Sequence, residues 1–324
     1  MKLGIIGTGR IAKRFVPECL LVPDTSITGV YNPHKESAEN FIDNGWNSQT
    51  WDRPFAISDI SDLWDKADVI YIASPHETHY NYIMTSLEHG KHVLCEKPMA
   101  LSKSQTEEAF DCADKQGLIL MEGLKTAYCP GYQKLLTIIR DGTIGRIRYI
   151  DATFTKLENP QNRELNDRLY GGSFTELGSY VMLPVIDLLG SDYRDVSFES
   201  ITNEKGIDIF TKADIRYRDA MATLICGLGV KAEGRLLISG EKGYIKVDAP
   251  WWKTRHTEVH FEDESKTVSY DEPFEGDGLR YEIQNFLDRI HSDKSTISEA
   301  MIDTMHRSIT MSEIMDKFLS QRAA

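Results

Sequence analysis

Two short motifs, far apart in the sequence, carry residues that could act together. The sequence GTGRIA at residues 7–12 follows the apolar run 3–6, and the sequence EKP at residues 96–98 follows the apolar run 93–95. The first motif is typical of a turn that holds phosphate groups. The second places Lys97 at the carboxyl end of a later strand, where open α/β sheets bind their ligands. A dinucleotide and a lysine in one crevice predict hydride transfer.

The glycine-rich turn has the residue types that a pyrophosphate needs. Gly7 permits the tight turn, Gly9 lets the backbone come close to the phosphates, and Ala12 is small enough for the helix to pack closely on the strand. The helix that follows would offer unpaired N–H groups and a partial positive charge. A turn of this kind without a ligand is the alternative, but its position in the first βαβ unit favours a dinucleotide. The cofactor contacts predicted in this turn are Gly7, Thr8, Gly9, Arg10 and Ile11.

The end of the second predicted strand bears on which nicotinamide cofactor binds. NAD sites usually carry an acid there for the ribose hydroxyls, whereas NADP sites replace it with positive charge. This chain has Asn32, His34 and Lys35 in this segment and no acid at the strand end, with Arg10 in the first turn. We therefore expect NADP to be preferred over NAD, and we expect these residues to contact the cofactor. Alternatively, His34 and Lys35 are solvated residues at the start of a helix.

The first part of the chain alternates short apolar runs with helical patterns. Strands are predicted at residues 3–6, 27–31, 69–73, 92–96 and 119–122, and helices at 10–19, 35–43, 77–89 and 103–116. Gly90 and Gly117 should end two of these helices, and Ser102 should cap the start of the fourth. Pro17 should kink or end the first helix. This order predicts a doubly wound parallel sheet of the Rossmann type for residues 1–123.

From residue 124 the pattern changes, because strands follow strands. Strands are predicted at residues 146–157, 207–217, 220–226, 235–239 and 244–247, and helices at 132–140, 171–189, 279–291 and 299–318. The sequence GEKG at residues 240–243 is a hairpin signal. The fold class is therefore α/β, with a second, α+β domain at residues 124–324. This domain would be built on an open, mainly antiparallel sheet and would bind the substrate.

Composition and charge exclude several classes of partner. The chain has 324 residues, enough for two domains with buried cores, and a formal net charge of −13, which would repel nucleic acids and anionic membranes. No apolar run approaches the ~20 residues of a membrane span. Five cysteines are scattered without a CxxC pair, and we expect no targeting segment before the first strand. These features predict a cytoplasmic protein with reduced thiols.

With these motifs the whole chain resembles the glucose–fructose oxidoreductase, inositol dehydrogenase and MocA family. The resemblance rests on GTGRIA, on ASP at residues 73–75 followed by His79, on EKP, and on Gly171-Gly172 ahead of ELGSY at residues 176–180. The stretch VLCEKPM with the later LME looks closest to the dimeric dihydrodiol dehydrogenase branch. The family pairs a Rossmann domain with an open-faced sheet domain. The resemblance implies an NAD(P)-dependent enzyme that acts on a sugar, polyol or vicinal diol and forms a homodimer through the C-terminal sheet.

The resemblance also assigns roles around the cofactor. Lys97 would lie beside the nicotinamide, where an ammonium stabilises a developing alkoxide. A surface lysine after a strand is the alternative. Ser74, Pro75, His79 and Glu96 would complete the cofactor site.

A second set of roles concerns proton transfer. Many family members have Asp-x-Gly-x-His in the second domain, whereas this chain has Glu176 and Tyr180 at the matching positions. Tyr180 is the proton-transfer candidate, and the positive charge of Lys97 would lower the phenol pKa from its ordinary value of about 10. A tyrosine that simply packs on a helix face is the alternative. Glu176 lies on the same helix face and would contact a substrate hydroxyl or Lys97.

The remaining signals concern the substrate, metals and a rival function. Lys125, Phe154 and Trp252 are predicted to line the substrate pocket, although each fits packing or surface roles equally well. A cation at Lys125, where diol dehydrogenases have an aromatic residue, favours a polar, sugar-like or acidic substrate. The histidine pairs at 76 and 79 and at 89 and 92 lack supporting ligands, so no metal site is predicted. A non-catalytic sensor that binds a dinucleotide or sugar is the alternative function.

Overall fold

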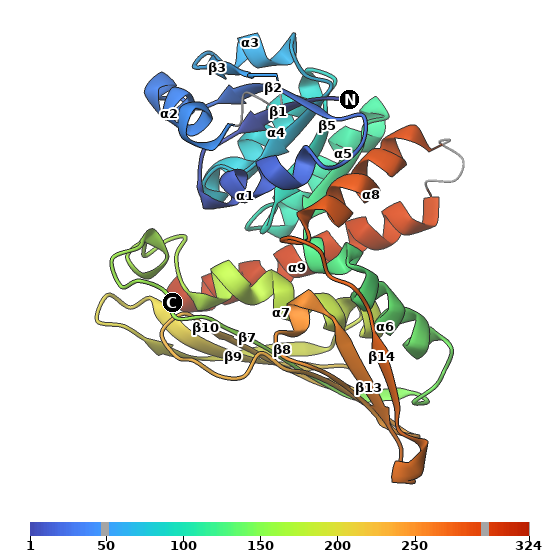
Figure 1. The fold of residues 1–324 in the computed structure, drawn as a ribbon. Coiled ribbons are helices and arrows are strands. Elements are labelled where there is room, and N and C mark those ends of the chain that lie inside the picture. Colours follow the sequence, from blue (N-terminus) through green and yellow to red (C-terminus); the bar gives the residue numbers. More distant parts are fainter. Residues whose placement is uncertain (47–51, 293–297, 324) are drawn as a thin grey trace. The chain divides into compact units, whose positions relative to one another are not determined.

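The computed structural model describes residues 1–46, 52–292 and 298–323, which form two compact units (Figure 1). Unit 1 consists of Met1–Lys125 and Gly276–Ile309, and unit 2 consists of Thr126–Glu275 and Thr310–Ala324. The predicted division, with one boundary after residue 123, differs from this arrangement. The described residues of Gly276–Ile309 cluster with unit 1, although the sequence assigned this segment to the second domain.

Unit 1 is built on a six-stranded parallel sheet with the strand order β3-β2-β1-β4-β5-β6. Its strands are β1 (Lys2–Ile6), β2 (Ser26–Tyr31), β3 (Phe55–Ile57), β4 (Val69–Ile72), β5 (His92–Glu96) and β6 (Leu120–Gly123). Its helices are α1 (Arg10–Cys19), α2 (Lys35–Gly45), α3 (Ser61–Trp64), α4 (His79–Glu88), α5 (Lys103–Gln116), α8 (Leu279–His291) and the first part of α9 (Ser298–Ala323). The strand order reverses between β1 and β4, which is where doubly wound sheets bind ligands. The predicted Rossmann arrangement is confirmed.

Local sequence signals account for the helix ends in this unit. Gly90 and Gly117 have φ angles of 72° and 65°, the left-handed conformation expected after a helix. The Ser102 hydroxyl accepts a hydrogen bond from the Gln105 amide and so caps α5. Pro17 lies in the last turn of α1, which ends two residues later. The central strand β4 is buried on both faces, as parallel strands covered by helices are.

Unit 2 is built on an eight-stranded sheet with the order β14-β13-β12-β11-β7-β10-β9-β8. Its strands are β7 (Ile147–Thr155), β8 (Asp195–Thr202), β9 (Asp208–Arg216), β10 (Met221–Gly227), β11 (Leu236–Gly240), β12 (Tyr244–Val247), β13 (His256–His260) and β14 (Val268–Asp271). Among the described pairs, β7 and β10 are parallel and the others are antiparallel. The predicted open, mainly antiparallel sheet is therefore confirmed, and GEKG joins β11 to β12 as a hairpin.

The helices of unit 2 lie on one face of this sheet. They are α6 (Pro130–Arg140), α7 (Ser173–Leu189) and the end of α9. Helix α7 packs on β7, β9 and β10, and the described part of the unit has no helix on the opposite face (Figure 1). This sheet is therefore open on one side.

Several short or exposed elements were not predicted from the sequence. Strand β3 has three residues, and β8 buries one side chain, that of Phe198. Strands β13 and β14 form the far edge of the sheet, where β14 is largely exposed. Because edge strands need not alternate strictly between apolar and polar residues, their pattern is weak. No helix in the described ranges is long and apolar enough to cross a membrane.

Two ion pairs hold the start of the Gly276–Ile309 segment in unit 1. Arg280 donates from Nε and Nη2 to the two carboxylate oxygens of buried Glu18 on α1, at 3.0 and 2.8 Å. One turn earlier on α1, Arg14 donates in the same two-pronged way to Asp277, at 2.7 and 2.8 Å. The Lys125 ammonium binds the Asp277 carbonyl oxygen. These contacts tie the start of α8 to the first helix of the sheet.

We expect Arg280→Met to lower the free energy of unfolding by about 3 kcal/mol, because it leaves the buried Glu18 carboxylate without its partner. Burial alone would raise the Glu18 pKa, but the bonds to Arg280 and to the backbone hold it below the ordinary value. The stabilisation should therefore be complete above pH 4.5, the ordinary Glu value, and should disappear as the pH falls further. Urea unfolding at several pH values measures both effects.

The exposed pair Arg53–Asp43 provides the matched control. Arg53→Met should cost about 0–1 kcal/mol, as surface ion pairs do. Equal losses in the two variants would show that the Glu18–Arg280 pair has no special role.

Candidate active site

The glycine-rich turn lies at the switch point of the unit 1 sheet. Gly7 has a φ of 106°, and a Cβ there would be 2.5 Å from the carbonyl oxygen of Ala73. The Gly7 amide binds the Tyr31 carbonyl oxygen at 3.0 Å. At Gly9, the residue before α1, a Cβ would find only the Ala73 oxygen within 4 Å, at 3.9 Å. The turn is therefore tight behind Gly7 and open in front of Gly9, a shape that fits a pyrophosphate.

The end of β2 is held to this turn by side-chain hydrogen bonds. Asn32 donates from Nδ2 to the Thr8 hydroxyl at 2.9 Å, and its Oδ1 accepts from the His34 amide at 2.9 Å. His34 and Lys35 are exposed where α2 begins, and Lys35 lies 3.8 Å from Glu39. Asn32 thus occupies the position where an acid would bind ribose hydroxyls. The other predicted cofactor residues of the turn are exposed or half-buried: Thr8, Arg10 and Ile11.

The ends of β4 and β5 are joined through His79. The His79 ring is fully buried, with Nδ1 at 2.8 Å from the Pro98 carbonyl oxygen and Nε2 at 2.9 Å from the Ser74 carbonyl oxygen. Within the turn after β4, the hydroxyls of Ser74 and Thr78 lie 2.7 Å apart, and Thr78 also donates to Pro75. The predicted residues of this region are therefore brought together, but His79 has no exposed surface with which to touch a cofactor.

The EKP motif leaves β5 beside buried acids. The Tyr71 hydroxyl donates to Glu96 at 2.6 Å, and the ring of Tyr71 stacks on Phe15. Burial raises the Glu96 pKa, while the Tyr71 bond and the positive charges of Lys97 and Lys125 act in the opposite direction. Lys97 itself is half-buried, and the peptide bond to Pro98 is cis.

A second buried acid lies behind this motif. Glu122, in β6, accepts hydrogen bonds from the Met99 amide at 3.0 Å and from the Ser308 hydroxyl at 2.7 Å. Burial raises its pKa, and Lys97 is among the charges that oppose this shift. Sequence reasoning missed Glu122 and Tyr71 as site residues, because their role depends on tertiary contacts.

Lys125 lies in unit 1, where its ammonium is buried. Burial and the nearby charge of Arg14 lower the Lys125 pKa. Glu282 of α8 is fully buried beside this group, and neither of its carboxylate oxygens has a hydrogen-bond partner among the described residues. Burial, followed by the charge of Glu96, raises the Glu282 pKa well above its ordinary value. A substrate-pocket role for Lys125 stays a prediction, and its ammonium already binds Asp277.

In unit 2 the predicted aromatic residues meet in one group. The Phe154 ring of β7 stacks on Trp252 with centroids 3.6 Å apart and planes 6° apart. Tyr180 of α7 meets the same Phe154 ring edge-on at 5.1 Å. The neighbouring Trp251 is fully buried and donates to the Thr153 carbonyl oxygen at 3.0 Å. Three side chains singled out separately from the sequence thus form one aromatic cluster, which we define as Phe154, Tyr180 and Trp252.

The start of α7 is fixed by a glycine pair and an aspartate. A Cβ at Gly172 would overlap with the Asp208 carboxylate, so no larger residue fits there. The same carboxylate accepts a hydrogen bond from the Phe174 amide at 2.8 Å. One turn into the helix, Glu176 accepts from Arg163 at 3.2 Å. Arg163 and Asp208 were not predicted, because no local pattern marks the partner of a distant side chain.

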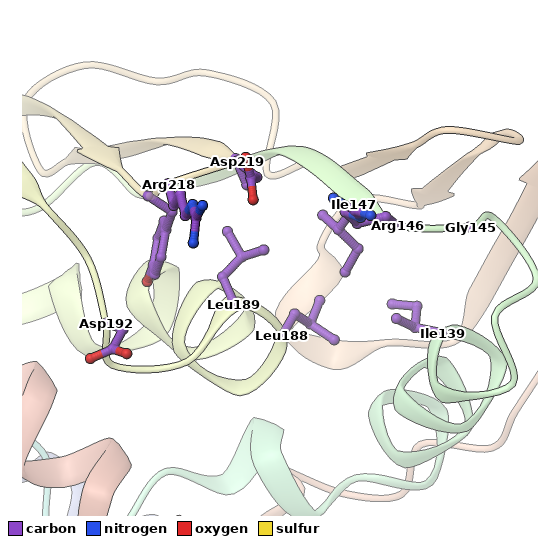
Figure 2. Close-up of a pocket in the computed structure, with 11 residues that line it drawn as sticks. Ile139, Gly145, Arg146, Ile147, Leu188, Leu189, Asp192, Arg218 and Asp219 are labelled. Carbon is purple, nitrogen blue, oxygen red and sulfur yellow. The ribbon is translucent and has the colours of Figure 1, made fainter.

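A pocket elsewhere in unit 2 contains none of the predicted site residues. It has a volume of about 450 Å³ and lies at the C-terminal end of α7, with Arg146 and Arg218 at its rim and Leu188 and Leu189 inside (Figure 2). The chemistry-bearing residues lie at other positions in the chain. In the described ranges, no cluster of three or more His, Cys, Asp or Glu side chains is arranged to hold a metal ion.

We expect Gly7→Ala to weaken NADPH binding at least tenfold and to lower the melting temperature, because any Cβ there must displace the Ala73 carbonyl and the backbone conformation is unfavourable for alanine. Gly45→Ala, at the end of α2 with no atom within 4 Å of the new Cβ, is the control and should leave both unchanged. Fluorescence titration and thermal unfolding measure the two effects. Tight NADPH binding by Gly7→Ala would show that the turn does not hold the cofactor.

Comparison with known proteins agrees with this geometry. The family model described as "Oxidoreductase family, NAD-binding Rossmann fold" matches residues 1–124, and the GFO/IDH/MocA C-terminal domain matches residues 132–246. The chain is 27% identical to scyllo-inositol 2-dehydrogenase (NADP(+)) IolU of Bacillus subtilis, over 99% of this chain and 97% of that protein. It is 26% identical to trans-1,2-dihydrobenzene-1,2-diol dehydrogenase of Xenopus laevis, with the same coverage.

Solved structures share the fold. The 3-ketoreductase KijD10 of Actinomadura kijaniata, in a complex with TDP-benzene and NADP, superimposes with a TM-score of 0.78, 21% identity, and coverage of 98% of this chain and 96% of that chain. UDP-N-acetylglucosamine 3-dehydrogenase GnnA of Acidithiobacillus ferrooxidans gives a TM-score of 0.76 at 20% identity, covering 100% and 97%. The two matching domains together span most of the sequence. The chain therefore belongs to the GFO/IDH/MocA family of oxidoreductases and uses NADP or NAD.

Proposed function

We propose that this NAD(P)-dependent oxidoreductase transfers a hydride between nicotinamide C4 and a secondary alcohol or carbonyl of a sugar, polyol or vicinal diol, with NADP preferred. The observation that carries this proposal is the open glycine turn at the switch point, with Lys97 following β5, two strands away in the same sheet. The bound nicotinamide supplies the hydride chemistry, and the protein supplies position and electrostatics.

Lys97 is the residue that would stabilise charge on the reacting oxygen. A half-buried ammonium after β5 can donate to an alkoxide as it forms, and such stabilisation is often the largest contribution to catalysis. The buried carboxyls of Glu96 and Glu122 are close enough to interact electrostatically with Lys97. They would limit the movement of the lysine side chain.

Tyr180 is the proposed proton donor or acceptor for the substrate hydroxyl. Its ring is supported by Phe154, which in turn stacks on Trp252, so the phenol sits on a rigid base. Glu176, one helical turn earlier, has its carboxylate engaged by Arg163. We propose that Glu176 contacts a substrate hydroxyl while Arg163 holds its carboxylate in place.

The preference for NADP rests on the end of β2. Asn32 stands where NAD enzymes carry an acid, and the nearby Arg10, His34 and Lys35 side chains are exposed. A 2′-phosphate would meet positive charge there, with Asn32 in place of a carboxylate at the strand end. The relative IolU is described as NADP(+)-dependent, which agrees with this preference.

The aromatic cluster favours a cyclic, hydroxylated substrate. The half-buried ring of Trp252, supported by the buried Phe154 ring stacked on it, would fit the C–H face of a sugar or cyclic diol, while Tyr180 and Glu176 would fit the hydroxyls. The relatives act on an inositol and on a dihydrodiol, which are both cyclic and hydroxylated.

We also propose that the chain works in the cytoplasm as a homodimer through the uncovered face of the unit 2 sheet. Its partners would be small molecules rather than nucleic acids or membranes.

We expect NADPH to bind in the micromolar range and more tightly than NADH, and at least one member of a panel of inositols, sugars and trans-diols to be turned over. Lys97→Ala should reduce kcat by about 10²–10³-fold with little change in NADPH affinity, because one charge-stabilising donor is lost. Lys91→Ala, just before the same strand, is the control. Tight cofactor binding without turnover across the panel would favour the sensor function instead.

Tyr180→Phe should lower kcat by about 10²–10⁴-fold if the phenol transfers the proton, since it keeps the ring contact with Phe154 and removes only the hydroxyl. Tyr244→Phe, at an exposed position of β12, should retain full activity. Steady-state kinetics on the best panel substrate measures both. Full turnover by Tyr180→Phe would assign proton transfer to another group.

A further inference from the structure

His79 connects two loops at the point where the backbone pairing of their strands has ended. The last register pair between β4 and β5 is Ile72 with Cys95. Beyond it, the His79 ring reaches the Ser74 carbonyl oxygen with Nε2 and the Pro98 carbonyl oxygen with Nδ1. One ring therefore joins the turn after β4 to the segment that carries Lys97.

Two partners of this ring are carbonyl oxygens, which favour a proton on each ring nitrogen. Carbonyl oxygens only accept hydrogen bonds, and a neutral imidazole has a single N–H. Both bonds are made at once only when the ring carries protons on both nitrogens. A neutral ring would leave a nitrogen lone pair facing a carbonyl oxygen at under 3 Å in a fully buried place, which is unfavourable.

The side chains around the ring are compatible with a clamp. His79 is the first residue of α4, so its backbone is fixed by the helix that follows. One titratable side chain in ring contact with it is His76, whose centroid lies 5.6 Å away and edge-on. The turn on the Ser74 side is rigid in itself, because Thr78 binds both Ser74 and Pro75.

We propose that His79 is a positioning residue whose doubly protonated ring clamps the turn after β4 to the EKP segment and thereby fixes where Lys97 points. It acts through two backbone carbonyls and touches neither cofactor nor substrate. The kinetic consequence rests on the proposed role of Lys97, whereas the state of the ring does not.

The first experiment measures the protonation of the His79 ring directly, in the protein without cofactor or substrate. Nitrogen-15 NMR of histidine-labelled protein at pH 7 should show a directly bonded proton on both ring nitrogens of His79. The signal is assigned by its loss in His79→Leu. A His79 ring with one unprotonated nitrogen at this pH would overturn the clamp, whatever the enzyme's substrate.

The second experiment separates positioning from general stability. His79→Gln keeps at most one of the two bonds and His79→Leu keeps neither, so we expect kcat to fall by about 10-fold and about 100-fold while the NADPH dissociation constant changes less than about 3-fold. His89→Gln, in the same helix region and bonded to one carbonyl oxygen, is the control and should retain wild-type kcat. Unchanged kcat in folded His79→Leu, or a loss confined to NADPH affinity, would overturn the proposal.

Discussion

The close approach of β1 and β4 is the constraint on which the rest of unit 1 depends. Because the chain after β1 turns with its backbone almost against the Ala73 carbonyl, Gly7 has no room for a side chain. That contact sets the direction in which α1 leaves the sheet and points its first amides at the space in front of Gly9. The same contact brings the end of β4, with Ser74, to the turn. The cofactor site is thus a consequence of how two neighbouring strands end.

Several titratable side chains of unit 1 are buried around the ends of β5 and β6. Glu96, Glu122 and Glu282 are buried acids with raised pKa values, and Lys125 is a buried amine with a lowered one, in each case first because of burial. Each shift reduces the charge that must be buried. The environment behind Lys97 is therefore polar without carrying a large net charge. Such an environment can hold a lysine side chain in place.

The sequence predicted those features that depend on local signals. The bounds of α1, β5 and α5 agree with the prediction because glycines, an N-cap serine and apolar periodicity mark them. The catalytic candidates could be named for the same reason, since each lies in a recognisable motif, and their roles stay a prediction. The sequence could not predict which distant side chains form ion pairs, because only the fold brings them together. The Arg163–Glu176 pair joins residues in different segments, and Glu18–Arg280 spans most of the chain. No sequence motif near Leu279 indicates that α8 packs against α1, so the predicted domain division did not place α8 with the first domain.

The division of unit 1 between the two ends of the sequence has a consequence for how the protein is made. The first 125 residues leave the ribosome well before Asp277 and Arg280 are synthesised. During that interval Arg14 and Glu18 lack the ionic partners they have in the finished molecule, and the surface of α1 that α8 later covers faces water. All six strands of the Rossmann sheet are synthesised before the 126–275 segment, but α8 and the first part of α9, which complete unit 1, are synthesised only after it.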